Sequence, residues 1–360
     1  MSSIQIYAGT KARQHIADAG IAANDISAIV AAAGGPKGLA MMGLDHYLFT
    51  DWLPSQPRAR SAYGASIGAW RVAAGTRNNA SAALIRLSEA YLERQRYPAK
   101  PSAQFVSTIC RQVVSNLIDH ADDFIANQNS DWQLSVITAQ SRHYDSAAQF
   151  KRMFVRAASC NALSRAYLSV YLKRFIFESG LQSATTSPVP NDQFGQRRIQ
   201  LDSQNLEDAL LSSGSIPLVA DPIASIAGAP SNAAYWDGGL IDYHLYWPWH
   251  QLEGLVLYPH FCSHVTAGWL DKFLPWRKHG VGAQGNSWLS NVILIVPSDA
   301  FISKLPNAKL PDRKDFYRYG QDHDRRIGDW RIAMQQCQRL ADDFAAFVEH
   351  PERFTIKPLQ

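Results

Sequence analysis

The sequence predicts an α/β protein of three layers, α/β/α, with a central and largely parallel sheet. Two successive strand–turn–helix units and one late strand carry this prediction. The apolar run 26–33 ends in a glycine-rich turn at 34–38, and a second apolar approach ends in the turn 64–68 before the helix-forming run 69–74. A further apolar run, 291–296, has the composition of a strand. Continuous apolar runs are typical of strands buried on both faces of a parallel sheet, and successive units of this kind usually lie side by side.

The bulk composition is that of one large globular domain over residues 1–360. Of these residues 46% are hydrophobic and 18% are charged, and the net charge of +4 is small. Because the charges are scattered, nothing indicates a nucleic-acid partner. The N-terminal stretch does not resemble a cleaved signal, and no run approaches about 18 consecutive apolar residues, so we expect a cytoplasmic protein with no transmembrane helix. The four cysteines are far apart and form no CxxC pair, which argues against a metal site.

Two segments stand outside the strand–turn–helix units. The first, 80–185, has a mainly helical pattern and is expected to be an insertion or a lid, with helices at about 105–124 and 147–177. The second, 245–360, is expected to be a C-terminal extension that packs on the core. It ends in an amphipathic helix whose apolar positions run from 327 to 347.

The turn 34–38 has a geometry that binds anions, because it follows a strand and precedes a helix. Backbone N–H groups at such a turn converge on one point, where a phosphate or a transition-state oxyanion fits. The sequence around Lys37 and Gly38 lacks the spacing of a Walker loop, and the dinucleotide pattern Gly-x-Gly-x-x-Gly is not met. We therefore expect no nucleotide cofactor and an oxyanion hole at Gly34, Gly35, Lys37 and Gly38, with a tight turn that has no chemistry as the alternative.

The stretch Gly64–Gly68 has the form Gly-x-Ser-x-Gly and is interpreted as a nucleophile elbow. In such an elbow a serine occupies a strained strand-to-helix turn, and the flanking Gly64 and Gly68 remove side chains that would collide there. The candidate nucleophile is Ser66. Because the motif is short enough to arise by chance, its interpretation depends on a base and an oxyanion hole elsewhere in the chain.

A candidate base follows an aromatic strand end. Asp237 is followed by Gly238 and Gly239, which places a carboxylate on a tight turn with little side-chain cover. The chain order of serine, acid and histidine in α/β-hydrolases makes His244 or His250 an alternative base in a catalytic triad.

Three blocks together resemble the patatin-like phospholipases, a family of lipid acyl hydrolases with a Ser–Asp dyad. Residues 34–39 are similar to the oxyanion loop of the family, and 64–68 match its elbow. Residues 209–217, followed by 235–239, resemble the helix end and the Asp-Gly-Gly motif that close its catalytic domain. One departure is Ala33, which stands where the family has its first glycine and which can still offer a backbone N–H.

The resemblance implies that Asp237 takes the proton from Ser66 directly, with no histidine between them. Microscopic reversibility then makes the same carboxyl the acid that protonates the leaving group and the base that activates water. The expected activity is cleavage of carboxylic esters of lipids, of the phospholipase A type, through an acyl-serine intermediate and without a metal or cofactor. The alternatives are a soluble esterase or thioesterase with the same dyad, and a catalytically silent lipid-binding scaffold.

The segment that begins at Trp269 combines aromatic and basic residues. Trp269, Phe273 and Trp276 are expected to contact a membrane surface peripherally, since amphipathic aromatic rings favour the lipid boundary. The alternative is a loop that packs on the body of the protein.

Overall fold

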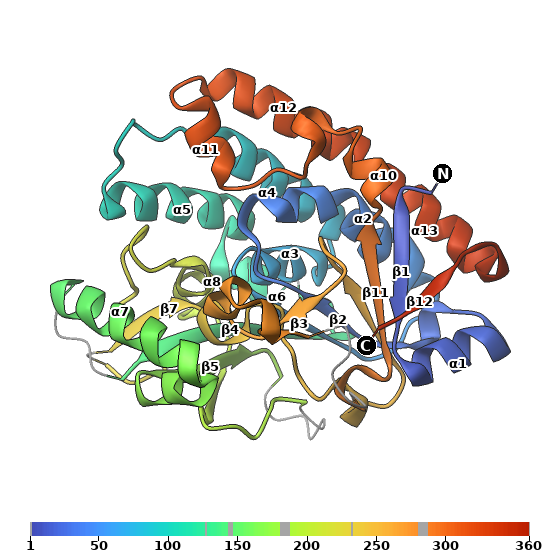
Figure 1. Ribbon diagram of the computed structural model, residues 1–360, viewed down its shortest axis with the longest axis horizontal. Helices are drawn as coiled ribbons and strands as arrows, with labels where there is room; N and C mark the ends of the chain where they lie inside the picture. The colour runs from blue at the N-terminus through green and yellow to red at the C-terminus, as the bar shows by residue number, and fades with distance from the viewer. Residues whose placement is uncertain are drawn as a thin grey trace.

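The computed structural model describes residues 2–126, 128–142, 147–180, 188–231, 233–279 and 287–359. These residues form a three-layer α/β/α fold around a ten-stranded, largely parallel sheet, which confirms the predicted fold class (Figure 1). Across the sheet the strands are β12 (Ile356–Pro358), β1 (Ile4–Ala8), β11 (Val292–Pro297), β8 (Leu255–Pro259), β2 (Ile26–Ala31), β3 (Arg60–Ala65), β4 (Trp132–Ser141), β5 (Leu172–Glu178) and β6 (Gln196–Gln200). A tenth strand, β7 (Ala234–Asp237), pairs with β4.

The centre of the sheet is parallel and buried. The neighbouring strands β11, β8, β2, β3 and β4 all run in the same direction. Strand β1 runs antiparallel to β11, and both β5 and β7 run antiparallel to β4. Nearly every residue of β2, β3, β8 and β11 is buried, as expected for strands covered on both faces.

The position of β7 brings two distant parts of the chain together. On one edge of β4, β3 pairs with the first half as far as Ala65, which lies opposite Ile137. Strand β5 occupies the opposite edge of β4. Strand β7 therefore lies on the same edge as β3, where it pairs with the second half of β4 and places Asp237 opposite Thr138. The ends of β3 and β7 therefore meet in line, about one residue rise of 3.3 Å apart along β4.

Helices cover the two faces of the sheet. They are α1 (Thr10–Ala19), α2 (Met42–Tyr47), α3 (Ile67–Gly75), α4 (Ala80–Arg94), α5 (Ala103–Ile118), α6 (Ala121–Ala126), α7 (Ala147–Leu163), α8 (Leu206–Gly214), α9 (Gly239–Asp242), α10 (Asp299–Ile302), α11 (Lys314–Tyr319), α12 (His323–Gln336) and α13 (Arg339–Glu349). Helix α3, which begins directly after Ser66, packs across β2 and β3 and contacts α2, α4 and α8. Figure 1 shows α12 and α13, in orange and red, outside these helices, where they contact α2 and α4. None of the described helices is long and apolar enough to cross a membrane.

Three expected helices are wrong in extent. The pattern at 105–124 is two helices, α5 and α6, because the backbone of Asp119 turns into the left-handed region with a φ of 64° and ends α5. The stretch 147–177 is helical only as far as Leu163, and its last part is strand β5. The apolar stripe 327–347 spans the two helices α12 and α13, which are separated after Gln336.

The expected segments 80–185 and 245–360 do not form layers of their own. Within the described part of the first, β4 and β5 belong to the central sheet, and α4 and α5 lie beside α3 and α8. The second supplies β8 and β11 to the sheet in addition to the outer helices α12 and α13. Both segments are therefore part of the core, and the surroundings of Ser66 are assembled from distant parts of the chain.

Candidate active site

Ser66 lies at the turn between β3 and α3 with strained backbone angles. Its φ is 56° and its ψ is −132°, which is an unusual conformation for a residue with a side chain. The turn requires close backbone approaches, because a Cβ atom at Gly68 would lie 2.0 Å from the carbonyl oxygen of Ala31 and one at Gly64 would lie 2.5 Å from the backbone of Ala69. The expected elbow geometry is thus present, and Ser66 is only 4% exposed.

A second serine fixes the elbow from the side of α8. The backbone N–H of Ser66 donates to the hydroxyl oxygen of Ser213 at 2.9 Å, and that hydroxyl donates to the carbonyl oxygen of Ile137 at 2.7 Å. Ser213 thereby satisfies a buried amide and ties the elbow to β4. This residue was not singled out by the sequence, although it lies in the block 209–217 that carries part of the family resemblance.

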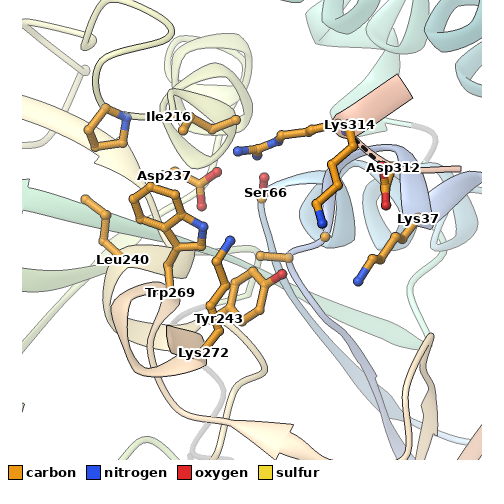
Figure 2. A pocket seen from close by; sticks show the side chains of 14 residues that line it. Lys37, Ser66, Ile216, Asp237, Leu240, Tyr243, Trp269, Lys272, Asp312 and Lys314 are labelled. Atoms are coloured by element: carbon orange, nitrogen blue, oxygen red, sulfur yellow. Dashed lines mark hydrogen bonds between the residues drawn. The ribbon is translucent and has the colours of Figure 1, made fainter. Parts of the chain in front are cut away.

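Asp237, the last residue of β7, faces Ser66 across a shared cavity. Figure 2 shows the carboxylate and the serine hydroxyl turned toward each other. The N–H of Gly239 donates to Oδ1 of Asp237 at 2.7 Å and holds the carboxylate in place. A Cβ atom at Gly238 would lie 2.2 Å from the carbonyl oxygen of Ile137, so the turn after Asp237 also depends on a residue without a side chain.

The surroundings of Asp237 make it a stronger base than an ordinary aspartate. The carboxyl is only 6% exposed, and burial raises its pKa from 3.8 to about 6. The Ser66 hydroxyl and the positive charge of Arg313 lower the pKa in turn, without cancelling the effect of burial. Asp237 therefore remains largely ionised at neutral pH and accepts a proton more readily than an exposed aspartate does.

The glycine turn offers two open amides beside Ser66. The 3₁₀ helix Gly35–Met41 begins directly after Gly34, and Gly35 has a positive φ of 58°. Within the described part of the chain, the amides of Gly34 and Gly35 have no hydrogen-bond partner, and both residues line a cavity together with Ser66. The amides of Lys37 and Gly38 point along the 3₁₀ helix toward carbonyls three residues earlier, so the geometry favours the first two residues as oxyanion donors.

Ala33 does not contribute an open amide. Its N–H donates to the carbonyl oxygen of Tyr243 at 2.9 Å and ties the start of the glycine turn to the chain after Asp237. The departure from the family pattern at this position is thus compatible with an intact turn, but the sequence-based expectation of a free N–H at Ala33 is wrong.

Two cavities of different character meet at Ser66. The first, here called the polar cavity, has a volume of about 200 Å³ and is lined by Asp237, Tyr243, Trp269 and four basic side chains. The second, here called the apolar cavity, has a volume of about 400 Å³. Helices α3, α4, α5 and α11 and the loops next to them contribute to its lining, which includes Ile67, Trp70, Tyr91, Val106, Ile109, Val113, Val219 and Phe316. Ser66, Ile216 and Arg313 line both cavities, so the two cavities adjoin each other at Ser66.

His244 and His250 line neither of the two cavities. His244 is buried and accepts the N–H of Thr266 on its Nδ1 at 3.0 Å. Its ring packs edge-on against His260 at 4.4 Å between ring centres. The geometry therefore gives no support to a catalytic triad that uses either histidine.

His244, His260 and Cys262 bring potential metal-binding atoms within 4.8 Å of one another. Burial lowers the pKa of both imidazoles, that of His260 to about 3, so the rings are neutral. Because Nδ1 of His244 accepts a hydrogen bond, a neutral ring carries its proton on Nε2 and keeps no lone pair there for a metal. The donor set of this cluster therefore does not suit a metal ion.

The three aromatic residues expected at a membrane occupy different environments. Trp269 lines the polar cavity and stacks on Phe154 with 6.0 Å between ring centres. Phe273 is 64% exposed and Trp276 is 72% exposed. The expectation of an outward-facing ring thus fits Phe273 and Trp276, whereas Trp269 belongs to the wall of the site.

Sequence reasoning missed three basic residues of the polar cavity: Lys272, Arg313 and Lys314. Arg313 and Lys314 lie on a segment without a recognisable motif, and Lys272 lies in the aromatic and basic segment that was expected at a membrane surface. Only the long-range packing of 245–360 brings all three to Ser66. The chain matches no protein-family model, and comparisons with curated proteins and with solved structures give no match.

Proposed function

We propose that the protein is a serine acyl hydrolase that cleaves carboxylic esters of lipids with a dyad of Ser66 and Asp237, as the patatin-like phospholipases do. The observation that carries the proposal is the strained serine at the end of β3, which faces a buried carboxylate at the end of β7. The four cysteines form no disulfide, which fits an enzyme of the cytoplasm.

In the proposed reaction the Ser66 oxygen attacks the ester carbonyl while Asp237 accepts the hydroxyl proton. The open amides of Gly34 and Gly35 stabilise the oxyanion, and loss of one such donor typically costs about 2.7 to 4 kcal/mol of transition-state stabilisation. Protonated Asp237 then gives its proton to the leaving alkoxide, which leaves an acyl group on Ser66. Asp237 then takes a proton from a water molecule, whose oxygen attacks the acyl carbon. The Ser66 oxygen leaves and takes the proton back from Asp237, which releases the acid and restores both residues.

The apolar cavity favours a lipid substrate over a small polar ester. A cavity of about 400 Å³ that opens at Ser66 and is lined by aliphatic and aromatic side chains suits a hydrocarbon chain of the acyl group. A soluble esterase or a thioesterase with the same dyad remains the alternative enzyme, and a silent lipid-binding scaffold the alternative from another class.

Hydrolysis of p-nitrophenyl esters by matched variants tests the dyad. We expect Ser66→Ala and Asp237→Asn each to reduce kcat at least 1,000-fold. The control Ser88→Ala should keep wild-type activity, because the Ser88 hydroxyl only donates to a carbonyl oxygen of its own helix α4. A fluorophosphonate probe is expected to label wild type and not Ser66→Ala. Labelling of another serine, or equal activity of Ser66→Ala and wild type, would refute the proposal.

The choice of a lipid substrate is tested separately. Wild type should hydrolyse long-chain esters better than two-carbon esters of the same alcohol, because only the long chain fills the apolar cavity. A preference for the short ester or for thioesters would favour the alternative enzyme, and no turnover of any ester would favour the scaffold.

A further inference from the structure

Four basic side chains from separate parts of the chain converge on the polar cavity. Lys37 comes from the glycine turn, Lys272 from the 3₁₀ helix Trp269–Phe273, and Arg313 and Lys314 from the start of α11. Figure 2 shows Lys272 and Lys314 on opposite sides of Ser66, with their ammonium groups turned toward the cavity. Among the described residues, none of these four side chains forms an ion pair with a carboxylate.

The cavity holds too little negative charge to balance these cations. Its two carboxylates are Asp237 and Asp312. Asp312 already binds Lys309 at 2.8 Å and accepts the backbone N–H of Lys314 at 2.8 Å. Asp237 is the proposed base, and its single negative charge balances only one of the four cations. The cavity therefore carries a surplus of positive charge that an anionic ligand would compensate.

The cations also repel one another. Burial, followed by the charges of Arg313 and Lys37, lowers the pKa of Lys272 to about 8. Close packing of like charges in a half-buried site is unfavourable unless a counter-ion binds there, and such arrangements are common at functional sites.

The same cavity is unsuited to a cationic headgroup. A quaternary ammonium group binds over the faces of aromatic rings. The aromatic faces available here belong to Tyr243 and Trp269, and the ammonium group of Lys272 already lies 5.7 Å and 4.7 Å from their ring centres. A choline group placed in this cavity would lie among four positive charges.

We propose that the polar cavity selects esters whose alcohol carries a net-negative phosphate and rejects those whose phosphate bears a choline. This selectivity rests on the proposed function, because it assigns the acyl chain to the apolar cavity and the alcohol to the polar cavity on the other side of Ser66. Arg313, Lys272 and Lys314 bind the phosphate. Lys37 contributes at longer range, since its ammonium group lies 4.7 Å from the ring centre of Phe261.

Hydrolysis of monomeric lysolipids measures the selectivity without a charged membrane surface. Lysophosphatidic acid and lysophosphatidylcholine with the same acyl chain are compared below their aggregation thresholds, and wild type should favour the first at least tenfold in kcat/KM.

Arg313→Gln and the charge reversal Lys314→Glu should each reduce this ratio at least tenfold. The control Lys304→Gln, an exposed cation of the same part of the chain, should leave the ratio at its wild-type value. Because a ratio is measured, effects common to both esters cancel. A wild-type ratio near one, or ratios that the cavity variants do not change, would overturn the proposal.

A binding experiment with the Ser66→Ala protein needs no hydrolysis. Glycerol 3-phosphate should raise Tm, glycerophosphocholine should not, and Lys314→Glu should abolish the shift. Equal shifts with the two ligands would overturn the headgroup selectivity even if esters are hydrolysed. A shift with inorganic phosphate but none with glycerol 3-phosphate would overturn it as well and would indicate a site for free phosphate. If glycerol 3-phosphate raises Tm but wild type hydrolyses no ester, the proposed function is refuted and the anion site is supported.

Discussion

Arg71 and Asp45 form a buried, bidentate ion pair that joins α3, the helix that follows Ser66, to helix α2, which follows the glycine turn. The Nε and Nη2 atoms of Arg71 donate to the two carboxylate oxygens of Asp45 at 2.6 and 2.8 Å, and both side chains are almost completely buried. The pair links the helix behind Ser66 to the segment that carries the proposed oxyanion donors. It therefore fixes the position of Ser66, the proposed nucleophile, relative to the proposed oxyanion hole.

Removing one member of this pair should strongly destabilise the fold. Arg71→Met leaves the Asp45 carboxylate buried without its partner, and we expect a loss of about 3 to 5 kcal/mol in the free energy of unfolding, measured in urea. The double variant Arg71→Met with Asp45→Leu should recover most of this loss, because no charge is left buried. As a control, Arg111→Met removes a half-exposed pair with Glu207 and should cost less than about 1 kcal/mol. Equal losses for the buried and the exposed pair would contradict this explanation.

The hydroxyl of Ser213 should matter for both stability and rate. In Ser213→Ala the buried amide of Ser66 loses its acceptor, which is expected to cost about 1 to 3 kcal/mol of stability. The elbow also loses its link to β4, so kcat should fall. The adjacent Ser212 is a matched control, because its hydroxyl bonds only the carbonyl of Ala209 in its own helix. Unfolding in urea and ester hydrolysis should both show a smaller effect of Ser212→Ala, and equal effects would argue against the role assigned to Ser213.

Local sequence patterns predicted the parts of the structure whose signal is local. The apolar runs 26–33 and 291–296 became β2 and β11, since a strand covered on both faces needs apolar residues throughout. The turn at Ser66 also has the strained geometry that its flanking glycines indicated. Helix ends were predicted less well, because apolar periodicity continues across a break such as the one at Asp119.

Long-range pairing was beyond local patterns. Nothing in the residues around Asp237 states that β7 pairs with β4 directly beyond β3, and this pairing alone brings the carboxylate to Ser66. The family resemblance implied the contact, whereas the sequence by itself did not. Arg313 and Lys314 were missed for a similar reason: in sequence a cation of an active site looks like a solvated one, and only tertiary packing distinguishes them.

The pH dependence of ester hydrolysis should report the ionisation of Asp237. The base acts in its ionised form, so kcat/KM for a neutral ester should rise tenfold per pH unit at acidic pH and level off above about 6, the pKa that burial produces. Arg313→Gln removes a positive charge that lowers this pKa, so the acidic limb should move to higher pH. An acidic limb near pH 4 in wild type would contradict the raised pKa of Asp237.

Unfolding measurements provide an independent check of the same pKa. The pKa of Asp237 is higher in the folded protein than its unfolded value of about 3.9, so the folded state binds the proton more tightly. The resulting stabilisation is complete below pH 4 and is lost as the pH rises through about 6. Asp237→Asn should therefore gain stability relative to wild type between pH 4 and pH 8, on the order of 2 kcal/mol.

The apolar cavity should determine the preferred acyl-chain length. Ile109 on α5 lines this cavity, and Ile109→Trp fills part of its volume. We expect the optimal acyl chain to become shorter, with little change in kcat for the shortest esters. Ile85→Trp is the control, because Ile85 on α4 is exposed and lies outside the cavity lining. A chain-length profile of p-nitrophenyl esters that is the same for Ile109→Trp and wild type would place the acyl chain elsewhere.

The exposed rings of Phe273 and Trp276 should anchor the protein at a lipid surface. Trp269 and Lys272 belong to the wall of the polar cavity, and Phe273 and Trp276 follow them in sequence with exposed side chains. Insertion of these two rings into a membrane would therefore bring the mouth of the polar cavity to the lipid. Burial of one large apolar side chain contributes about 1.5 to 3 kcal/mol, so each of Phe273→Ala and Trp276→Ala should weaken binding to phosphatidylglycerol vesicles about tenfold or more.

Tyr317 distinguishes this local anchor from general surface hydrophobicity. Its ring is 89% exposed but belongs to α11 and borders the apolar cavity, whereas Phe273 and Trp276 belong to the segment 269–276. Tyr317→Ala should therefore weaken vesicle sedimentation less than Trp276→Ala does. Phe273→Ala and Trp276→Ala should keep wild-type kcat on soluble short-chain esters, because neither the Phe273 ring nor the Trp276 ring lines the cavities at Ser66. The double variant Phe273→Ala with Trp276→Ala lacks both exposed rings of the segment. If it sediments with vesicles as wild type does, this segment is not the membrane contact.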